Sequence, residues 1–135
     1  MKINKQNLAV LIELCKKEYP KEACGILAGT NGLVKKVYPL QNVSEKPETC
    51  YFMEPKEQLQ VFKEMRKNNL AMLAIYHSHI KVPAYPSKKD TELAFYPDAG
   101  YVIISLSESN LNHPSVKLFR IIAGTIQEES FENIE

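Results

Sequence analysis

The sequence has no tryptophan, and only three cysteines and three histidines occur among its 135 residues. Cys15, Cys24 and Cys50 are odd in number and lack C-x-x-C spacing, which argues against both a disulfide framework and a zinc ribbon. We therefore expect reduced, mostly buried thiols in a cytoplasmic protein. No run approaches the roughly 18 apolar residues of a membrane span. The first residues also lack the pattern of a signal peptide, so we expect no membrane partner.

The sequence also lacks an excess of charge of either sign. Lys and Arg total 17 and Asp and Glu total 16, which gives a formal net charge of +1. Proteins held to nucleic acid by bulk charge are strongly basic, so no nucleic-acid partner is expected. Hydrophobic residues make up 44% and charged residues 24%, as in ordinary globular proteins. The length is that of one domain, which we expect to span residues 1–135.

Hydrophobic spacing predicts that helices alternate with strands. Apolar residues from Leu8 to Cys15 recur at helical spacing and predict a helix over residues 5–18. Asn31-Gly32 is a hairpin signal between predicted strands at 23–29 and 33–40. The other predictions are strands at 49–53, 71–76, 101–106 and 116–122, an edge strand at 124–131, helices from 55 to 68–69 and at 87–95, and a turn at 110–114. This order predicts an α/β domain with a mixed sheet covered by helices on both faces.

Two of the histidines, His77 and His79, lie in one tripeptide at the end of the predicted strand at 71–76. Residues i and i+2 of a strand share a face, so both imidazoles can aim at one point and chelate zinc. An H-x-H tripeptide alone also fits two surface histidines on an edge strand. Asp90 lies in the first turn of the next predicted helix, and it would complete the three protein ligands of a catalytic zinc site.

Local alternatives remain open for the neighbouring polar residues. Ser87 and Asp90 fit a helix N-cap and a capping box as well as they fit a site. Ser78 points away from the histidines by strand alternation, which favours a structural role. A hydrolytic zinc site needs a general base, but H-E-x-x-H is absent. No local rule selects Glu22, which by itself fits a solvated loop charge.

The pattern of these residues resembles the JAMM motif of MPN-plus zinc metalloproteases. That motif reads E, then H-[ST]-H, seven residues, S, two residues and D. All five functional positions are present here, as Glu22, His77, His79, Ser87 and Asp90. The order of the predicted elements fits that family's fold, a cytidine-deaminase-like three-layer α/β/α sandwich, over nearly the whole chain. In size the chain is most similar to the bacterial and archaeal single-domain members.

The resemblance implies a role for each matching position. His77, His79 and Asp90 would bind Zn²⁺. Glu22 would act as general base and then as general acid, and Ser87 would help to hold the water ligand and stabilise the oxyanion. The implied reaction is hydrolysis of a peptide or isopeptide bond. The implied substrate is the Gly-Gly tail of a ubiquitin-like or sulfur-carrier protein, which could bind by strand addition at a sheet edge.

Ile80 stands where many relatives have proline, so the loop that shapes the substrate groove is expected to differ.

A non-catalytic MPN-type scaffold that holds a partner protein is the alternative function, but the complete ligand set argues against it. A zinc nucleoside deaminase would need H-x-E and P-C-x-x-C signatures, and neither occurs in the chain.

Overall fold

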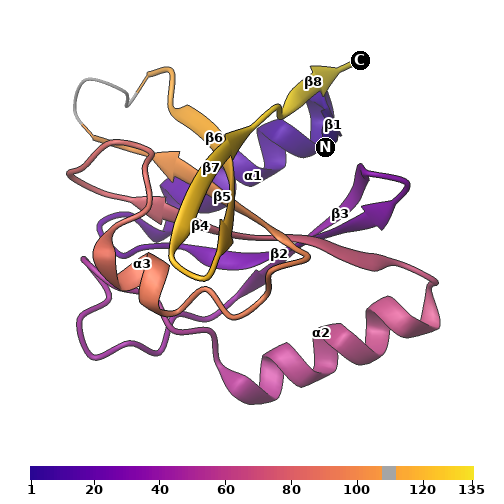
Figure 1. The fold of residues 1–135 in the computed structure, drawn as a ribbon, viewed down its shortest axis with the longest axis horizontal. Helices are drawn as coiled ribbons and strands as arrows, with labels where there is room; N and C mark the ends of the chain where they lie inside the picture. Colours follow the sequence, from indigo (N-terminus) through magenta and orange to yellow (C-terminus); the bar gives the residue numbers. More distant parts are fainter. Residues whose placement is uncertain (108–111) are drawn as a thin grey trace.

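One sheet runs through the middle of the molecule and carries the helices (Figure 1). The computed structural model describes residues 1–107 and 112–135. Its strands are β1 (Lys2–Asn4), β2 (Cys24–Thr30), β3 (Leu33–Leu40), β4 (Ala71–His79), β5 (Gly100–Ser105), β6 (Ser115–Ile122), β7 (Thr125–Glu129) and β8 (Glu132–Ile134). Its helices are α1 (Lys5–Glu18), α2 (Pro55–Lys67) and α3 (Lys88–Glu92). The strands pair in the order β7-β6-β5-β4-β2-β3-β1-β8.

The sheet is mixed, because it contains both parallel and antiparallel pairs of strands. β2 pairs antiparallel with β3 and with β4. β4 pairs parallel with β5, and α3 lies on the connection between them. β5, β6 and β7 form antiparallel pairs, whereas β1 runs parallel to both β3 and β8. This arrangement confirms the predicted α/β class with a mixed sheet.

Alternation along the strands divides the core between the two faces of the sheet. On β4, Ile75 belongs to one buried cluster, which also holds Met65 of α2. Its neighbours Ala74 and Tyr76 belong to the other cluster, which holds Leu11 of α1. Helices α1 and α2 therefore cover opposite faces. Because His77 and His79 follow Ile75 at even spacing, they point to the face that α2 covers.

Local signals explain where the two long helices begin. The side chain of Asn4 accepts a hydrogen bond from the Asn7 N–H (2.8 Å) and caps α1. Glu54 accepts from the Glu57 N–H (2.7 Å) before α2, and Pro55 occupies the first turn. Within residues 1–107 and 112–135, none of the helices has the length and apolar character needed to span a bilayer.

Several predicted boundaries differ from the observed ones. The strand predicted at 49–53 is wrong, since only a single bridge joins Met53 to Asn42. The helix predicted at 87–95 is limited to Lys88–Glu92. β1 was missed because three residues carry no periodicity, and it is held by pairing with two strands far away in sequence. The turn predicted at 110–114 lies partly outside the described residues.

Gly25 lies in β2 where three strands approach closely. A Cβ atom on this residue would collide with the backbone oxygen of Tyr38 and with the ring of Tyr76. The first contact is with backbone, so a change of side-chain rotamer cannot relieve it. The absence of a side chain is therefore required here for the packing between β2, β3 and β4.

We expect Gly25→Ala to lower the free energy of unfolding by about 3 kcal/mol, the upper end of the usual cost of overpacking. Urea denaturation would measure the change. Gly124→Ala is the matched control, because its Cβ would meet nothing within 4 Å although φ is +80°. That control should cost only about 1 kcal/mol. Equal losses in the two variants would contradict the packing explanation.

Candidate metal and catalytic site

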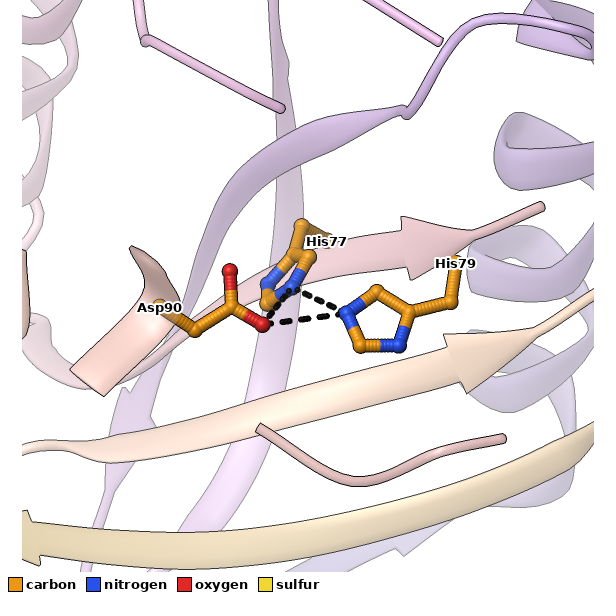
Figure 2. A group of neighbouring side chains, drawn as sticks. All are labelled: His77, His79 and Asp90. Atoms are coloured by element: carbon orange, nitrogen blue, oxygen red, sulfur yellow. Dashed lines mark hydrogen bonds and ion pairs between the residues drawn. The ribbon is translucent and has the colours of Figure 1, made fainter. Parts of the chain in front are cut away.

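Three side chains converge beside the end of β4, where α3 approaches it. His77 and His79 come from β4 and Asp90 comes from α3, as Figure 2 shows. Their ligand atoms form a small triangle: His77 Nε2 to His79 Nε2 is 3.0 Å, His77 Nε2 to Asp90 Oδ2 is 3.1 Å, and His79 Nε2 to Asp90 Oδ2 is 3.0 Å. The prediction that both imidazoles share one face is confirmed.

The triangle has the chemistry and size of a metal site. Ligand atoms of a tetrahedral zinc ion with bonds of about 2.0–2.1 Å lie about 3.3 Å apart, close to the 3.0–3.1 Å found here. Two imidazole nitrogens and a carboxylate oxygen are donors that zinc prefers. The histidines are also buried, with 1% and 2% of their surface exposed. These three residues could therefore hold one metal ion.

A backbone carbonyl orients His79. Its Nδ1–H donates a hydrogen bond to the carbonyl oxygen of Pro83 (2.8 Å). The proton then sits on Nδ1, and the lone pair of Nε2 faces the triangle, which is the usual arrangement for a metal-binding histidine.

His77 is supported differently. Among the residues that the structure describes, none forms a hydrogen bond with its Nδ1. Instead, the ring of Tyr51 stacks on the imidazole with centroids 4.4 Å apart and planes 22° apart. The two imidazoles that form the triangle are therefore held by different contacts: a hydrogen bond to a carbonyl for His79 and a stacked ring for His77.

Ser87 both caps α3 and lies beside the triangle. Its Oγ accepts a hydrogen bond from the Asp90 N–H (3.0 Å), and its own N–H donates to Asp90 Oδ2 (2.9 Å). The predicted capping box is confirmed. A hydroxyl has two lone pairs and one proton, so the Ser87 O–H remains able to donate to another group. Capping and a role in the site are therefore compatible.

Burial and mutual contacts shift the pKa values of the cluster. Burial alone would raise the pKa of the Asp90 carboxyl, but hydrogen bonds from His77 and His79 outweigh it and hold that pKa well below its usual range. Burial lowers the pKa of His77. Burial also acts to lower the pKa of His79, but the hydrogen bonds to Asp90 and to the Pro83 carbonyl raise it overall.

Glu22 is a buried carboxylate next to this cluster, with 4% of its surface exposed. Its N–H donates to the carbonyl of Pro47 (2.7 Å). The following residue, Ala23, exchanges two hydrogen bonds with Ser78, through Ser78 Oγ (2.8 Å) and the Ser78 N–H (3.0 Å). The expected structural role of Ser78 is thus confirmed, and it fixes the chain beside Glu22.

The surroundings of the Glu22 carboxyl favour its neutral form. Within the described part of the chain, its Oε1 has no hydrogen-bond partner. Burial raises the pKa of this carboxyl from 4.5 to about 7, against an opposing effect of His79. A carboxyl group in this range can both accept and return a proton near neutral pH.

A cleft of about 350 Å³ joins these parts of the site. Glu22, His79 and Ser87 line it, and Ile80 contributes to an apolar wall with Pro20 and Val82. The structure thus brings together the five residues selected from the sequence. Glu22 arrives through the antiparallel register that pairs Cys24 with His77, a signal that local sequence patterns do not contain.

Three supporting groups were missed from the sequence: the Pro83 carbonyl, Tyr51, and Asn42, whose side chain donates to the Glu22 carbonyl (2.9 Å). Each acts through a contact between segments distant in the chain or through backbone atoms. No spacing rule would have found them.

Known proteins with similar sequences include named peptidases. The CysO-cysteine peptidase of Mycobacterium tuberculosis is 34% identical over 127 residues, which cover 93% of this chain and 85% of that protein. A probable TtuB-protein conjugate cleaving protease of Thermus thermophilus is 44% identical over 78 residues, covering 58% of this chain and 52% of that one.

Solved structures share the fold. Protein DSY2949 of Desulfitobacterium hafniense superposes with a TM-score of 0.89 at 38% identity, covering 99% of this chain and 92% of that chain. The JAB1/MPN domain protein AF2198 of Archaeoglobus fulgidus gives 0.69 at 21% identity over the full length of both, which shows the fold alone. The family model for prokaryotic homologues of the JAB domain matches residues 4–122. The chain therefore belongs to the family of prokaryotic homologues of the JAB domain.

Proposed function

We propose that this chain is a single-domain, zinc-dependent hydrolase of peptide or isopeptide bonds. The observation that carries the proposal is the meeting of two elements in one cleft. One is a triangle of three metal-ligand atoms, 3.0–3.1 Å apart, and the other is a buried carboxylate whose pKa is about 7. The named peptidases among its relatives support the same reaction class.

In this proposal His77, His79 and Asp90 hold Zn²⁺. A bound zinc ion supplies a Lewis acid, which polarises a carbonyl oxygen and makes water a stronger acid. Glu22 takes a proton from the attacking water and passes it to the leaving amine, for which its raised pKa is suited. Ser87 donates its free O–H toward the oxygen on which negative charge develops.

We infer that the substrate is the C-terminal Gly-Gly tail of a ubiquitin-like or sulfur-carrier protein. The names of the relatives refer to CysO-cysteine and to conjugates between TtuB and protein, and both describe bonds made to a protein partner. An extended tail without side chains at its end suits a cleft of about 350 Å³. A cytoplasmic location and the lack of a nucleic-acid partner stay predictions from composition.

The first test concerns the metal. We expect purified protein to contain about one equivalent of zinc, as a three-residue site with one open position does. His77→Ala and Asp90→Asn should each abolish this content, whereas His113→Ala, in an exposed loop, should retain it. Elemental analysis would measure all four proteins. Zinc far below one equivalent in the unmodified protein, unchanged in both variants, would refute the site.

The second test concerns the reaction. We expect the protein to hydrolyse a carrier protein that is extended beyond its Gly-Gly terminus. Glu22→Gln should lower kcat by about 10²–10⁴-fold, the usual contribution of a general base. Ser87→Ala should lower it by about 10²–10³-fold if its hydroxyl acts on the oxyanion. Zinc content measured in both variants separates lost chemistry from lost metal, and full activity of Glu22→Gln would remove Glu22 from its role.

The third test follows from the cost of burying Glu22. In metal-free protein this carboxyl keeps its proton to about pH 7, whereas the unfolded chain releases it near 4.5. Between these values the folded state binds more protons, so its stability must fall as pH rises. The fall attributable to Glu22 amounts to at most about 3 kcal/mol.

We therefore expect metal-free wild-type protein to lose more stability between pH 5 and pH 8 than metal-free Glu22→Gln, because a glutamine does not titrate. Urea denaturation at both pH values, with a chelator present, would measure the difference. The Glu22 carboxylate also raises the pKa of His79, so the difference between the two proteins reports Glu22 together with its interaction with His79. Identical pH dependence would show that burial does not hold this carboxyl neutral.

A further inference from the structure

Asn42 lies in the loop after β3 and uses every hydrogen-bonding position of its side chain. Its Nδ2 donates to the carbonyl oxygens of Glu22 (2.9 Å) and Cys50 (3.0 Å). Its Oδ1 accepts from the N–H groups of Ser44 (3.0 Å) and Phe52 (3.0 Å). A primary amide offers two donors and two acceptor lone pairs, so this network is complete.

The partners of Asn42 belong to both halves of the site. One partner is the backbone of Glu22, the buried carboxylate. Two others, the Cys50 carbonyl and the Phe52 N–H, flank Tyr51 on either side. The Glu22 N–H is also held by Pro47 of the same loop (2.7 Å). One side chain therefore fixes both the Glu22 backbone and the peptide that carries Tyr51.

The ring of Tyr51 contacts the imidazole of His77, whose Nδ1 has no hydrogen bond to any described residue. His79 is oriented through its Nδ1–H by the Pro83 carbonyl (2.8 Å), which is the usual way to fix a metal-binding imidazole. His77 has no such bond to any described residue, and the Tyr51 ring lies 4.4 Å from it in a nearly parallel stack. An offset or stacked ring contact restricts the plane of the imidazole without a hydrogen bond.

We propose that Asn42 and Tyr51 are positioning residues that act as one unit: Asn42 fixes Tyr51 and the Glu22 backbone, and the Tyr51 ring orients His77. The proposal rests on the proposed function, since His77 is taken as a metal ligand and Glu22 as the base. Its consequence is that one amide links the Glu22 backbone in the base half of the site to the peptide that carries Tyr51 in the metal half. Disturbing that amide should damage both halves at once.

The ring of Tyr51 is tested by zinc affinity, measured on metal-free protein by competition with a chromogenic chelator. Tyr51→Leu removes the stack and should weaken zinc binding by about 10- to 100-fold, the usual effect of losing the support of a ligand. Tyr51→Phe keeps the ring and should bind zinc nearly as wild type does. Wild-type affinity in Tyr51→Leu, or equal losses in both variants, would overturn the role of the stacked ring.

Asn42 is tested by its effect on both halves. Asn42→Ala should weaken zinc binding and, at saturating zinc, should lower kcat more than it raises KM, because the Glu22 backbone is released. Asn68→Ala is the matched control, since Asn68 Nδ2 also donates to a backbone carbonyl, that of Glu64 (2.9 Å), but at the exposed end of α2. An effect of Asn42→Ala no larger than that of Asn68→Ala would overturn the proposal.

A third measurement needs neither zinc nor a substrate. Nitrogen-15 NMR of the histidine rings in metal-free protein reports the environment of each imidazole. Tyr51→Leu should shift the His77 ring signals and leave those of the exposed His113 unchanged. Tyr51→Phe keeps the aromatic ring, so its His77 signals should lie close to those of the wild type. If hydrolysis is absent but this pattern is found, the proposed function fails and the positioning unit stands. Unshifted His77 signals in Tyr51→Leu overturn the unit itself, and this test rests on the Tyr51 variants alone if Asn42→Ala is too unstable to measure.

Discussion

The antiparallel register between β2 and β4 is the constraint on which the site depends. It pairs Cys24 with His77, and beyond that pair Ala23 and Ser78 exchange two hydrogen bonds. The serine between the histidines thus faces the opposite side of the sheet and anchors the chain that leads to Glu22. A slip of one residue would turn both imidazoles to the face that α1 covers and would move the carboxylate away from them.

The site concentrates ionisable groups in a largely buried region, and each group is held by a different contact. A capping box brings the Asp90 carboxylate toward the histidines, so the first turn of α3 serves both helix and site. A carbonyl fixes one imidazole and an aromatic ring lies on the other. Glu22 is different, because its Oε1 is buried and has no hydrogen-bond partner among the described residues. That cost is the kind that folded proteins accept at functional sites and offset elsewhere in the structure.

The sequence predicted the elements that have strong periodicity and the site residues that lie on them. Helices α1 and α2 were recognised with nearly their observed bounds because their apolar residues recur at helical spacing. Strands β3 and β6 were recognised from a hairpin signal and from an apolar run. His77 and His79 followed from strand alternation. Asp90 could equally have been only a cap, and Glu22 was selected by resemblance to a motif alone. The short strand β1 and the contacts of Asn42 and Tyr51 were not predicted, because each depends on a partner from another part of the chain.

The sequence by itself therefore determined the residue types of the cluster, the shared face of the two histidines and the cap that carries Asp90, since these follow from spacings of a few residues. Only the tertiary structure decided that a carboxylate joins them. The contact that anchors it spans 55 residues, from Ala23 to Ser78, and no local rule encodes such a pairing. The tertiary structure also decided how each imidazole is oriented. Backbone carbonyls and stacked rings come to a site through packing of the whole sheet, which is set by the sum of many weak contacts.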